Sequence, residues 1–409
     1  MLASPFAFYR GAAVIMAGDL VGTPDCGLTV QLCGDAHLSN FGLFASPERA
    51  HIFDINDFDE TLPGPWEWDV KRLAASFEVA GRHRGFSRSE RRELAQTVAL
   101  GYRERMRSSA ASPVLVAWYD RLDADQLFEL VRQAHTENRV NRDQVDTVGV
   151  RLAKARLRDS VRAFRKLVYV VDGELRIRPH PPLIVPMSDL GPAGRARSDD
   201  EETVRELLRR YQSTLLQSNH PLRDFEFVDI ARKVVGVGSV GTRSWVVLLR
   251  GRDNGDPLLL QAKQAESSVL EKYLPPSAYD NHAERVVRGQ RIAQSASDIF
   301  LGWQRVKGFD DLSRDFYVRQ LTDWKASVDV DVMQFPVAQL YARLCGETLA
   351  RAHARSGDRV AIAAYLGASD AFDRAIATFA ELYADQNDLD FGVFQEAVAS
   401  GRLEADAGV

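Results

Sequence analysis

The sequence predicts an α+β protein of two lobes, in which a helical lobe comes first, a small antiparallel sheet lobe follows and helices close the chain. At 409 residues, the chain exceeds the length that one hydrophobic core usually organises. Apolar residues recur mostly at helical spacing from position 66 to about 218, and again from about 335. Between about 225 and 321 they form short strand-like runs. The expected parts are residues 1–224, 225–326 and 327–409, with the last part packing on the first.

Two short strands are expected near the start of the chain, at residues 28–32 and around residues 51–53. Each strand leads into a polar loop, residues 33–40 after the first and the acid-rich residues 54–60 after the second. Loops at strand ends often carry chemistry, because the strand fixes the position and the loop supplies the side chains. Later in this lobe, a capping box formed by Ser87 and Glu90 predicts the start of a long helix.

The predicted sheet lobe consists of short strands and one helix. The Asn254-Gly255 dipeptide tolerates the positive φ angles of a tight turn and predicts a hairpin within the lobe. Asp172-Gly173 predicts another hairpin before the lobe begins. The strands of the lobe are expected at residues 230–235, 244–250, 258–262, 300–307 and 316–321, and its helix at residues 281–295.

The composition limits the classes of partner. Lys and Arg number 52 against 57 Asp and Glu, a net charge of −5, so the chain lacks the basic excess of a nucleic-acid binder. Its three cysteines show no metal-ligand spacing and are typical of a protein in the reducing cytosol. The apolar run at residues 11–18 is too short to span a bilayer. We therefore expect a cytoplasmic protein that binds neither nucleic acid nor membrane.

A polar constellation runs from Gly34-Asp35 through His37 and Asn40 to Asp54. Phosphoryl transfer from a nucleotide requires a carboxylate that orients the acceptor hydroxyl and oxygen ligands that hold Mg²⁺ between the phosphates. An Asp and an Asn on one loop, with an Asp at the end of the next strand, supply these groups. The predicted catalytic residues are Asp35, His37 and Asn40. The predicted metal ligands are Asn40, Asp54 and Asp57.

A structural alternative exists for this constellation. Asp35 and Asn40 are also residue types that cap turns, and the acids between residues 54 and 60 also suit a solvated loop. However, Asp54 and Asp57 lie among strongly apolar residues, where negative charge is costly unless a cation, Lys or Arg neutralises it. This context favours the functional interpretation.

A glycine-rich turn separates two predicted strands, and a lysine lies on the third strand of the same lobe. Backbone N–H groups of such a turn approach phosphates closely. The nucleotide lobe of protein kinases has the same order of elements: a strand, a glycine turn, a second strand, a hairpin and a third strand that carries a lysine. The predicted nucleotide-binding residues are Gly236, Gly238, Ser239, Gly241 and Lys263.

In a nucleotide lobe of this kind, Lys263 contacts the phosphates and pairs with an acid on the following helix. Glu284 is the best-placed acid, and Glu271 is the second choice. Alternatively, Lys263 faces water at a strand edge and the glycines form only a tight turn between strands. Three further residues carry hypotheses. Asp69 braces the first polar loop, His353 makes a buried structural hydrogen bond, and Arg10 reaches a phosphate or an acid of the second loop.

Residues 33–40, followed by residues 52–54, resemble the catalytic and metal loops of aminoglycoside phosphotransferases and related small-molecule kinases. Residues 68–70 resemble the helix start that follows those loops. The resemblance implies a phosphotransferase that uses ATP, or another nucleoside triphosphate, with Mg²⁺ to modify a hydroxyl of a small molecule or protein. It also implies that Asp35 is the catalytic base and that Asn40 and Asp54 are metal ligands.

Most of the chain also resembles an uncharacterised bacterial family, domain of unknown function 2252. Its hallmarks here are residues 4–11, 33–42, 54–69 and 352–358. The resemblance names no substrate. It implies that relatives carry a segment before residues 4–11, which normally lie some way inside the domain.

The order of the parts differs from that of kinases, which place the glycine loop and its lysine before the catalytic loop. Here Lys263 follows Asp35 by more than two hundred residues. We therefore predict a circularly permuted, kinase-like fold. Residues 322–326 are the expected hinge, and residues 337–355 the helix that leads back to the catalytic loop. This fold places Lys263 opposite Asp54.

Two other functions remain alternatives. Gly-Asp-x-His also begins the motif of binuclear metal-dependent phosphoesterases, with Asp35 and His37 as ligands. That site needs a later Gly-Asn-His-Asp/Glu cluster, and the nearest match, Ser218-Asn219-His220, lacks the glycine and the acid. The second alternative is a non-catalytic nucleotide-binding regulator, since Cys33 replaces the histidine usual in the phosphotransferase motif.

Overall fold

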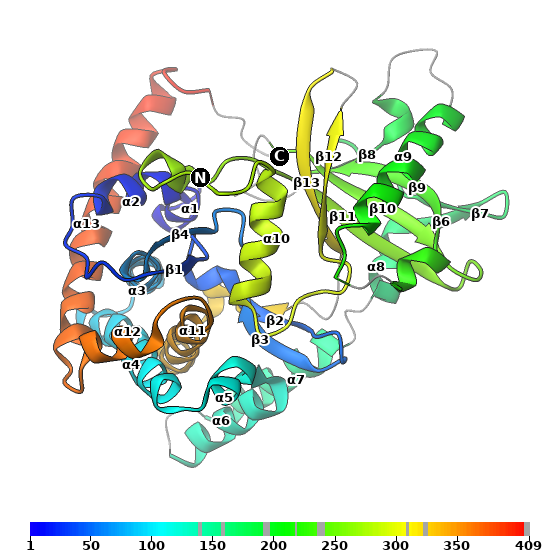
Figure 1. The fold of residues 1–409 in the computed structure, drawn as a ribbon. Helices are drawn as coiled ribbons and strands as arrows, with labels where there is room; N and C mark the ends of the chain where they lie inside the picture. The colour runs from blue at the N-terminus through cyan, green and yellow to red at the C-terminus, as the bar shows by residue number, and fades with distance from the viewer. Residues whose placement is uncertain are drawn as a thin grey trace.

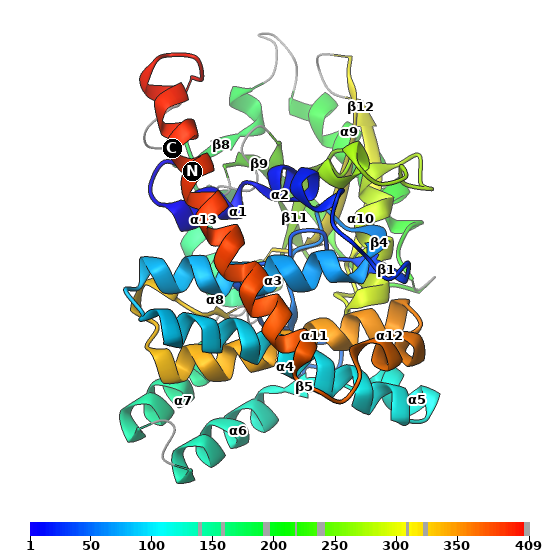
Figure 2. The same ribbon diagram turned by 90° about the vertical axis from the view of Figure 1, so that its left-hand side faces the viewer.

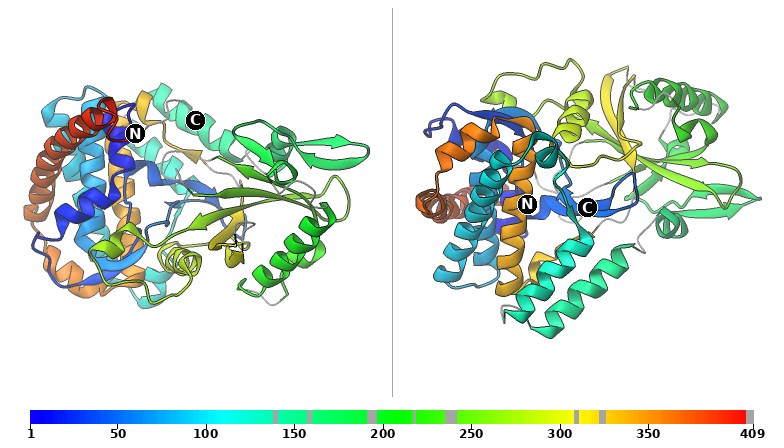
Figure 3. Two further views of the ribbon diagram at one scale, coloured as in Figure 1. Left: turned by 90° about the horizontal axis from the view of Figure 1, so that it is seen from above. Right: turned by 60° about the horizontal axis from the view of Figure 1, so that its bottom comes forward.

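The computed structural model describes residues 1–137, 141–156, 160–190, 197–216, 219–234, 242–307, 311–321 and 326–404. The protein combines helices with antiparallel sheets, which confirms the predicted α+β class. A mainly helical part and a part built on a six-stranded sheet lie side by side, as Figure 1 and the views in Figure 3 show. Within the described residues, no helix has the length and apolar character needed to cross a membrane.

Long helices form the helical part, and α3, α4, α11 and α13 pack around its core (Figure 2). Its helices from the first part of the chain are α1 (Pro5–Arg10), α2 (Ala13–Leu20), α3 (Trp66–His83), α4 (Arg88–Ala111), α5 (Val114–Tyr119), α6 (Ala124–Thr136) and α7 (Arg142–Arg156). Those from the end of the chain are α11 (Phe335–Ser356), α12 (Arg359–Leu366) and α13 (Ala371–Ala399). The closing helices therefore pack on the first part, because one continuous core contains buried residues from both.

Two small antiparallel sheets lie in the helical part and position its polar loops. One pairs β1 with β4, and the other has the order β14-β2-β3-β5. The predicted strands at residues 28–32 and 51–53 correspond to β1 and β3, whereas β2 and β4 were not predicted. The bounds are β1 (Thr29–Leu32), β2 (Phe41–Ala45), β3 (His51–Ile55), β4 (Leu62–Pro65), β5 (Leu122–Asp123) and β14 (Ala326–Ser327).

The six-stranded antiparallel sheet has the order β12-β13-β11-β10-β9-β8. All five predicted strands of the lobe are present, and the helix expected at residues 281–295 is α10 (His282–Ala293), capped by Asn281. The strands are β8 (Ile184–Pro186), β9 (Glu226–Lys233), β10 (Ser244–Arg250), β11 (Pro257–Ala265), β12 (Gly302–Lys307) and β13 (Ser313–Gln320). The predicted glycine turn, with Gly236, Gly238, Ser239 and Gly241, lies outside the described residues, as do residues 322–325 of the expected hinge.

The expected boundary at residue 224 is wrong. The β6–β7 hairpin (Val168–Val171 and Glu174–Ile177) and α8 (Ser160–Leu167) pack on one face of the six-stranded sheet, and α9 (Arg197–Gln212) packs on the other. Strand β8 extends the sheet itself by pairing with β9. Helical spacing in the sequence predicts helices in this region, but it does not show whether they pack on the helical part or on the six-stranded sheet. Each of these parts has an apolar surface on which an amphipathic helix can pack.

The end of α11 lies beside the strand that leads to the first polar loop. The backbone N–H of Gln31 in β1 donates to Ser356 Oγ at 3.1 Å. A Cβ on Gly357 would come within 2.6 Å of Val30 Cγ1, so only a glycine permits this approach without a shift. Segments more than three hundred residues apart are thereby joined in space.

Helices α4 and α11 approach closely because a glycine stands at their contact. A Cβ on Gly346 would lie 2.2 Å from the backbone oxygen of Val98. We expect Gly346→Ala to force the helices apart and to lower the free energy of unfolding by about 1–3 kcal/mol, measured by urea denaturation. The matched control is Gly392→Ala in α13, where the added methyl meets no atom within 4 Å. This change should be neutral or stabilising by up to about 1 kcal/mol. Equal effects of the two changes would contradict the close contact.

Candidate functional site

A carboxylate from α3 holds the first polar loop in place. Asp69 accepts hydrogen bonds from the backbone N–H groups of Cys33 at 2.8 Å and Gly34 at 3.2 Å. His353, which is completely buried, lies 3.3 Å from the same carboxylate and contacts the Tyr102 hydroxyl at 2.9 Å through its other ring nitrogen. Both hypotheses are confirmed, since Asp69 braces the loop and His353 makes a buried structural hydrogen bond.

Asp35 lies on this loop and is oriented by an arginine that sequence reasoning missed. Arg72 Nε donates to Asp35 Oδ1 at 2.7 Å, and its Nη2 lies 2.6 Å from the same oxygen. The guanidinium also donates to the Tyr9 carbonyl at 3.0 Å and lies over the Tyr9 ring. The available signal was spacing, because Arg72 follows Asp69 by three residues and therefore shares its face of α3.

His37 and Asn40 complete the loop around Asp35. His37 Nε2 lies 3.7 Å from Asp35 Oδ2, and His37 Nδ1 accepts from the Ser39 N–H at 3.2 Å. Burial, reinforced by Arg72 and Arg10, lowers the pKa of His37 to about 4, so the ring is neutral at pH 7 with its proton on Nε2. Asn40 Nδ2 donates to the Asp35 carbonyl at 2.8 Å. This hydrogen bond uses the amide nitrogen of Asn40 and fixes the orientation of the side chain. The amide oxygen, Oδ1, is the atom that suits a cation.

Asp54 is held by hydrogen bonds to the segment that follows α10. Its side chain is buried, and Oδ2 accepts from the Ser295 N–H at 2.9 Å and the Ser295 hydroxyl at 2.7 Å. The other oxygen, Oδ1, accepts from the Ile55 N–H at 2.9 Å. Oδ2 therefore links β3 to the residues just after α10, whereas Oδ1 contacts a neighbour in its own strand. None of these contacts involves Lys263, and the role of Asp54 as a metal ligand stays a prediction.

Asp57, two residues beyond the end of β3, is the carboxylate that faces the basic groups of the sheet. Burial opposes its ionisation, but the charges of Lys263 and Arg319 outweigh burial and lower the pKa of Asp57. The neighbouring Asn56 N–H donates to the Asn40 carbonyl at 2.8 Å, which joins the second polar loop to the first. Of the two carboxylates predicted as metal ligands, Asp57 therefore has the environment of an ionised site residue.

Lys263 is buried and reaches from β11 to the second polar loop. Its ammonium group pairs with the Asp59 carboxylate, which also accepts from the Tyr317 hydroxyl at 2.8 Å. This contact rules out the alternative that Lys263 faces water at a strand edge. Sequence reasoning located the lysine but chose the wrong acid.

The two acids proposed as partners of Lys263 have other partners. Glu284 pairs with Arg288 on its own helix at 3.3 Å, and Glu271 lies 3.9 Å from Arg285 Nε. A helix acid was expected because helix α10 follows the lysine strand in the chain. The excess of acids in residues 54–60 was the signal for the actual partner, Asp59.

The second polar loop is fixed to the sheet part by a buried arginine. Arg285 in α10 is 2% exposed and donates to the carbonyls of Thr61 at 2.7 Å, Asp59 at 2.8 Å and Glu266 at 2.8 Å. Glu60 adds a further link, because its carboxylate accepts from the Val269 N–H at 2.7 Å. Loop and sheet therefore form one continuous hydrogen-bonded unit.

Arg10 lies close enough to His37 to lower its pKa. The side chain is half-buried, and its Nε is buried without a hydrogen-bond partner. The expected contact with an acid of the second loop is not observed among the described residues. The hypothesis that Arg10 contacts a phosphate stays a prediction.

The residues present fit a weakly held Mg²⁺ better than a tightly held transition metal. Asn40 and Asp57 offer oxygen donors, and Mg²⁺ commonly takes one or two protein oxygens with phosphate and water completing its shell. Among the residues described, no group of three or more His, Cys, Asp and Glu side chains is placed to hold a metal ion. His220, from the motif considered for a phosphoesterase, instead caps a turn, accepting from the Leu222 N–H and contacting the Ile299 carbonyl.

Comparison with known proteins yields one match. The model of a bacterial family, described as "Uncharacterized protein conserved in bacteria (DUF2252)", matches residues 1–397. No curated protein and no solved structure matches the chain. The match therefore covers nearly the whole chain but brings no activity, substrate or cofactor with it.

The carboxyl group of Glu60 makes the free energy of unfolding depend on pH. Burial raises the pKa of Glu60 from its ordinary value of 4.5 to about 7. Between these pH values the folded protein keeps a proton that the unfolded chain has lost, so stability falls as the pH rises through this window, by up to about 3 kcal/mol. Glu60→Gln should remove this contribution. The free energy of unfolding of the variant, measured at pH 5 and at pH 7.5, should therefore fall less between the two pH values than that of the wild type. Parallel pH profiles of the two proteins would contradict the assignment.

Proposed function

We propose that this chain, which belongs to the bacterial DUF2252 family, transfers a phosphoryl group from a nucleoside triphosphate with Mg²⁺ to a hydroxyl of a small molecule or protein. One observation carries the proposal. Lys263 from the sheet part pairs with Asp59 in the loop that carries Asp57, and that loop is joined to the loop of Asp35 and Asn40 by the hydrogen bond from Asn56 N–H to the Asn40 carbonyl. These groups come from segments two hundred residues apart, and phosphoryl transfer is the chemistry that needs all of them together.

The order of elements supports a kinase-like, circularly permuted arrangement. Strands β9, β10 and β11 are consecutive neighbours in one antiparallel sheet, with the lysine on β11 and helix α10 following it. This order is that of the nucleotide lobe of protein kinases. The contact between Gln31 and Ser356 joins the end of α11 to the strand before the catalytic loop. In an unpermuted chain these two segments would be consecutive.

Asp35 is suited to accept the proton of the acceptor hydroxyl. Arg72 binds Oδ1 and fixes the carboxylate, while Oδ2 faces the neutral His37 at 3.7 Å. The carboxylate is partly exposed, with 23% of its side chain accessible, so an acceptor can reach it. Positioning of this kind contributes more to phosphoryl transfer than covalent chemistry does.

Asn40 and Asp57 would hold the Mg²⁺, which neutralises charge on the transferred phosphoryl group when bound. Lys263 supplies a cation for the other phosphates. Its pairing with Asp59 keeps the buried ammonium neutralised, and a nucleotide phosphate would compete with that carboxylate. Arg10, beside His37, is the further cation that a terminal phosphate would meet.

The assignment of the metal ligand is tested by nucleotide binding. Wild-type protein should show a thermal shift with ATP and Mg²⁺, because a ligand at 100 times its Kd stabilises by about 2.7 kcal/mol. Asp57→Ala should abolish the part of the shift that requires Mg²⁺. The matched control, Asp54→Ala, should lower the melting temperature but keep that part, since Asp54 binds Ser295. Loss of the shift in Asp54→Ala alone would contradict the assignment.

The role of Asp35 is tested by turnover. Asp35→Asn should slow formation of ADP by about 10²–10⁴-fold, because the general base is lost, while ATP binding remains within a few-fold of wild type. The measurement is ADP release, with water or a panel of hydroxyl compounds as acceptor, alongside calorimetric titration of ATP. Full activity in Asp35→Asn would exclude the base role. Failure of the wild-type protein to bind any nucleoside triphosphate would overturn the proposed function as a whole.

A further inference from the structure

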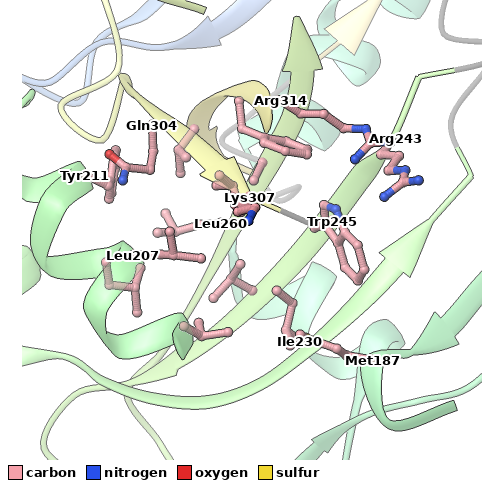
Figure 4. A pocket seen from close by; sticks show the side chains of 17 residues that line it. Met187, Leu207, Tyr211, Ile230, Arg243, Trp245, Leu260, Gln304, Lys307 and Arg314 are labelled. Atoms are coloured by element: carbon pink, nitrogen blue, oxygen red, sulfur yellow. The ribbon is translucent and has the colours of Figure 1, made fainter. Parts of the chain in front are cut away.

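Helix α5 places a run of apolar side chains on the outside of the helical part (Figure 2). Its sequence contains no charged residue, and only Ala117 is buried. The other five side chains, which are 47% to 72% exposed, form the α5 surface: Val114, Leu115, Val116, Trp118 and Tyr119. By contrast, the apolar side chains of the cavity between α9 and the six-stranded sheet, such as Leu207 and Leu260, face one another within the chain (Figure 4). The side chains of the α5 surface meet solvent instead.

The α5 surface is held in place at both ends of the helix. Arg359, at the start of α12, donates to the Ser112 carbonyl at 3.4 Å. Arg355, near the end of α11, donates to the Trp118 carbonyl at 3.2 Å. These contacts fix the backbone of α5 to the helical part and leave its apolar side chains facing outward. A surface that is already ordered loses little conformational entropy when a partner binds.

The composition of the α5 surface is that of the centre of a protein interface. Such centres are depleted of charged residues and enriched in aromatic ones, and α5 presents Trp118 and Tyr119 without a charge beside them in the helix. A Val or Leu side chain can bury roughly 60–120 Å² and an aromatic one about 150–250 Å². The exposed fractions therefore give an apolar area on the order of 500 Å², as large as the largest apolar patch of a typical monomer.

That area is sufficient for a contact between two identical chains. Two copies that met through this surface would bury on the order of 1,000 Å² from these side chains alone, which is the size that a specific interface requires. A twofold contact uses the same patch on both chains, so it closes on itself and needs no second complementary surface.

The charged groups that follow α5 in the chain are paired within the chain. Asp120 Oδ2 lies 3.1 Å from both Arg105 Nη1 and Arg351 Nε, and Arg121 Nε lies 3.1 Å from Asp123 Oδ1. An identical surface therefore meets no uncompensated like charge here, and a strongly charged partner gains little. The net charge of −5 also disfavours an anionic membrane, which attracts basic segments.

We infer that the α5 surface is the contact between two copies of this chain, which pack α5 against α5 about a twofold axis. The apolar area matches what a dimer needs, and the paired charges leave apolar contact as the main attraction. This inference does not depend on the proposed phosphotransfer activity.

The test measures association of the whole chain by sedimentation equilibrium. Wild-type protein should approach twice the 45.6 kDa mass of one chain as its concentration rises. The double change Leu115→Lys and Tyr119→Lys should raise the dissociation constant of the dimer about thirtyfold or more, because a few central apolar anchors carry most of the affinity. The matched control, Leu382→Lys and Leu389→Lys, alters two α13 leucines that are 63% and 66% exposed and should leave association unchanged.

A measurement on the wild-type chain keeps the inference testable if the lysine changes disturb folding. Amide hydrogen exchange at residues 113–120 should slow as the protein concentration rises. A wild-type chain that stays monomeric up to about 100 μM would overturn the inference. So would dimers that persist in the folded α5 variant, dimers that the α13 control also loses, or exchange at α5 that is independent of concentration. Binding of monomeric wild-type protein to anionic vesicles, lost in the α5 variant, would also overturn it, because the surface would then contact a membrane.

Discussion

The buried contacts between Lys263, Arg285 and the loop around Asp59 are the constraint on which the rest of the site depends. Two cations of the sheet part enter the interior at this point, and each needs a partner there. Lys263 finds the Asp59 carboxylate, and Arg285 finds three backbone carbonyls. Breaking a buried ion pair by removing one partner typically costs about 3–5 kcal/mol, because the other charge is left uncompensated. The second polar loop therefore cannot move independently of the sheet.

The first polar loop is fixed by a different device, a single face of α3. Asp69 holds the loop backbone and Arg72, one turn later, holds the Asp35 carboxylate. Because both anchors are side chains of one rigid helix, the positions of Asp35 and the loop backbone are set together. The site is thus formed by one loop anchored to the helical part and one anchored to the sheet part. Its geometry depends on how the two parts pack.

Features that depend on residues close together in the chain, such as strands and helix caps, were predicted well from the sequence. The strand at residues 244–250 has the predicted bounds, and the capping box of Ser87 and Glu90 is present. The choice of partners across the chain was predicted less well. Asp54 and Asp57 belong to the same acid-rich segment, and the sequence does not distinguish their partners. Tertiary packing alone places Ser295 against Asp54. Likewise, the chain order of kinases indicated a helix acid for Lys263, whereas the packed loop supplies Asp59.

Strands β11 and β13 present different surroundings on the two faces of the six-stranded sheet. Adjacent residues of β11 face opposite ways, so Ala262 lines an apolar cavity while Lys263 pairs with Asp59. Strand β13 does the same, with Phe316 at the cavity and Tyr317 bound to Asp59. Protein interiors are close-packed, so the packing of the cavity side chains and the position of Lys263 depend on the backbone of the same two strands.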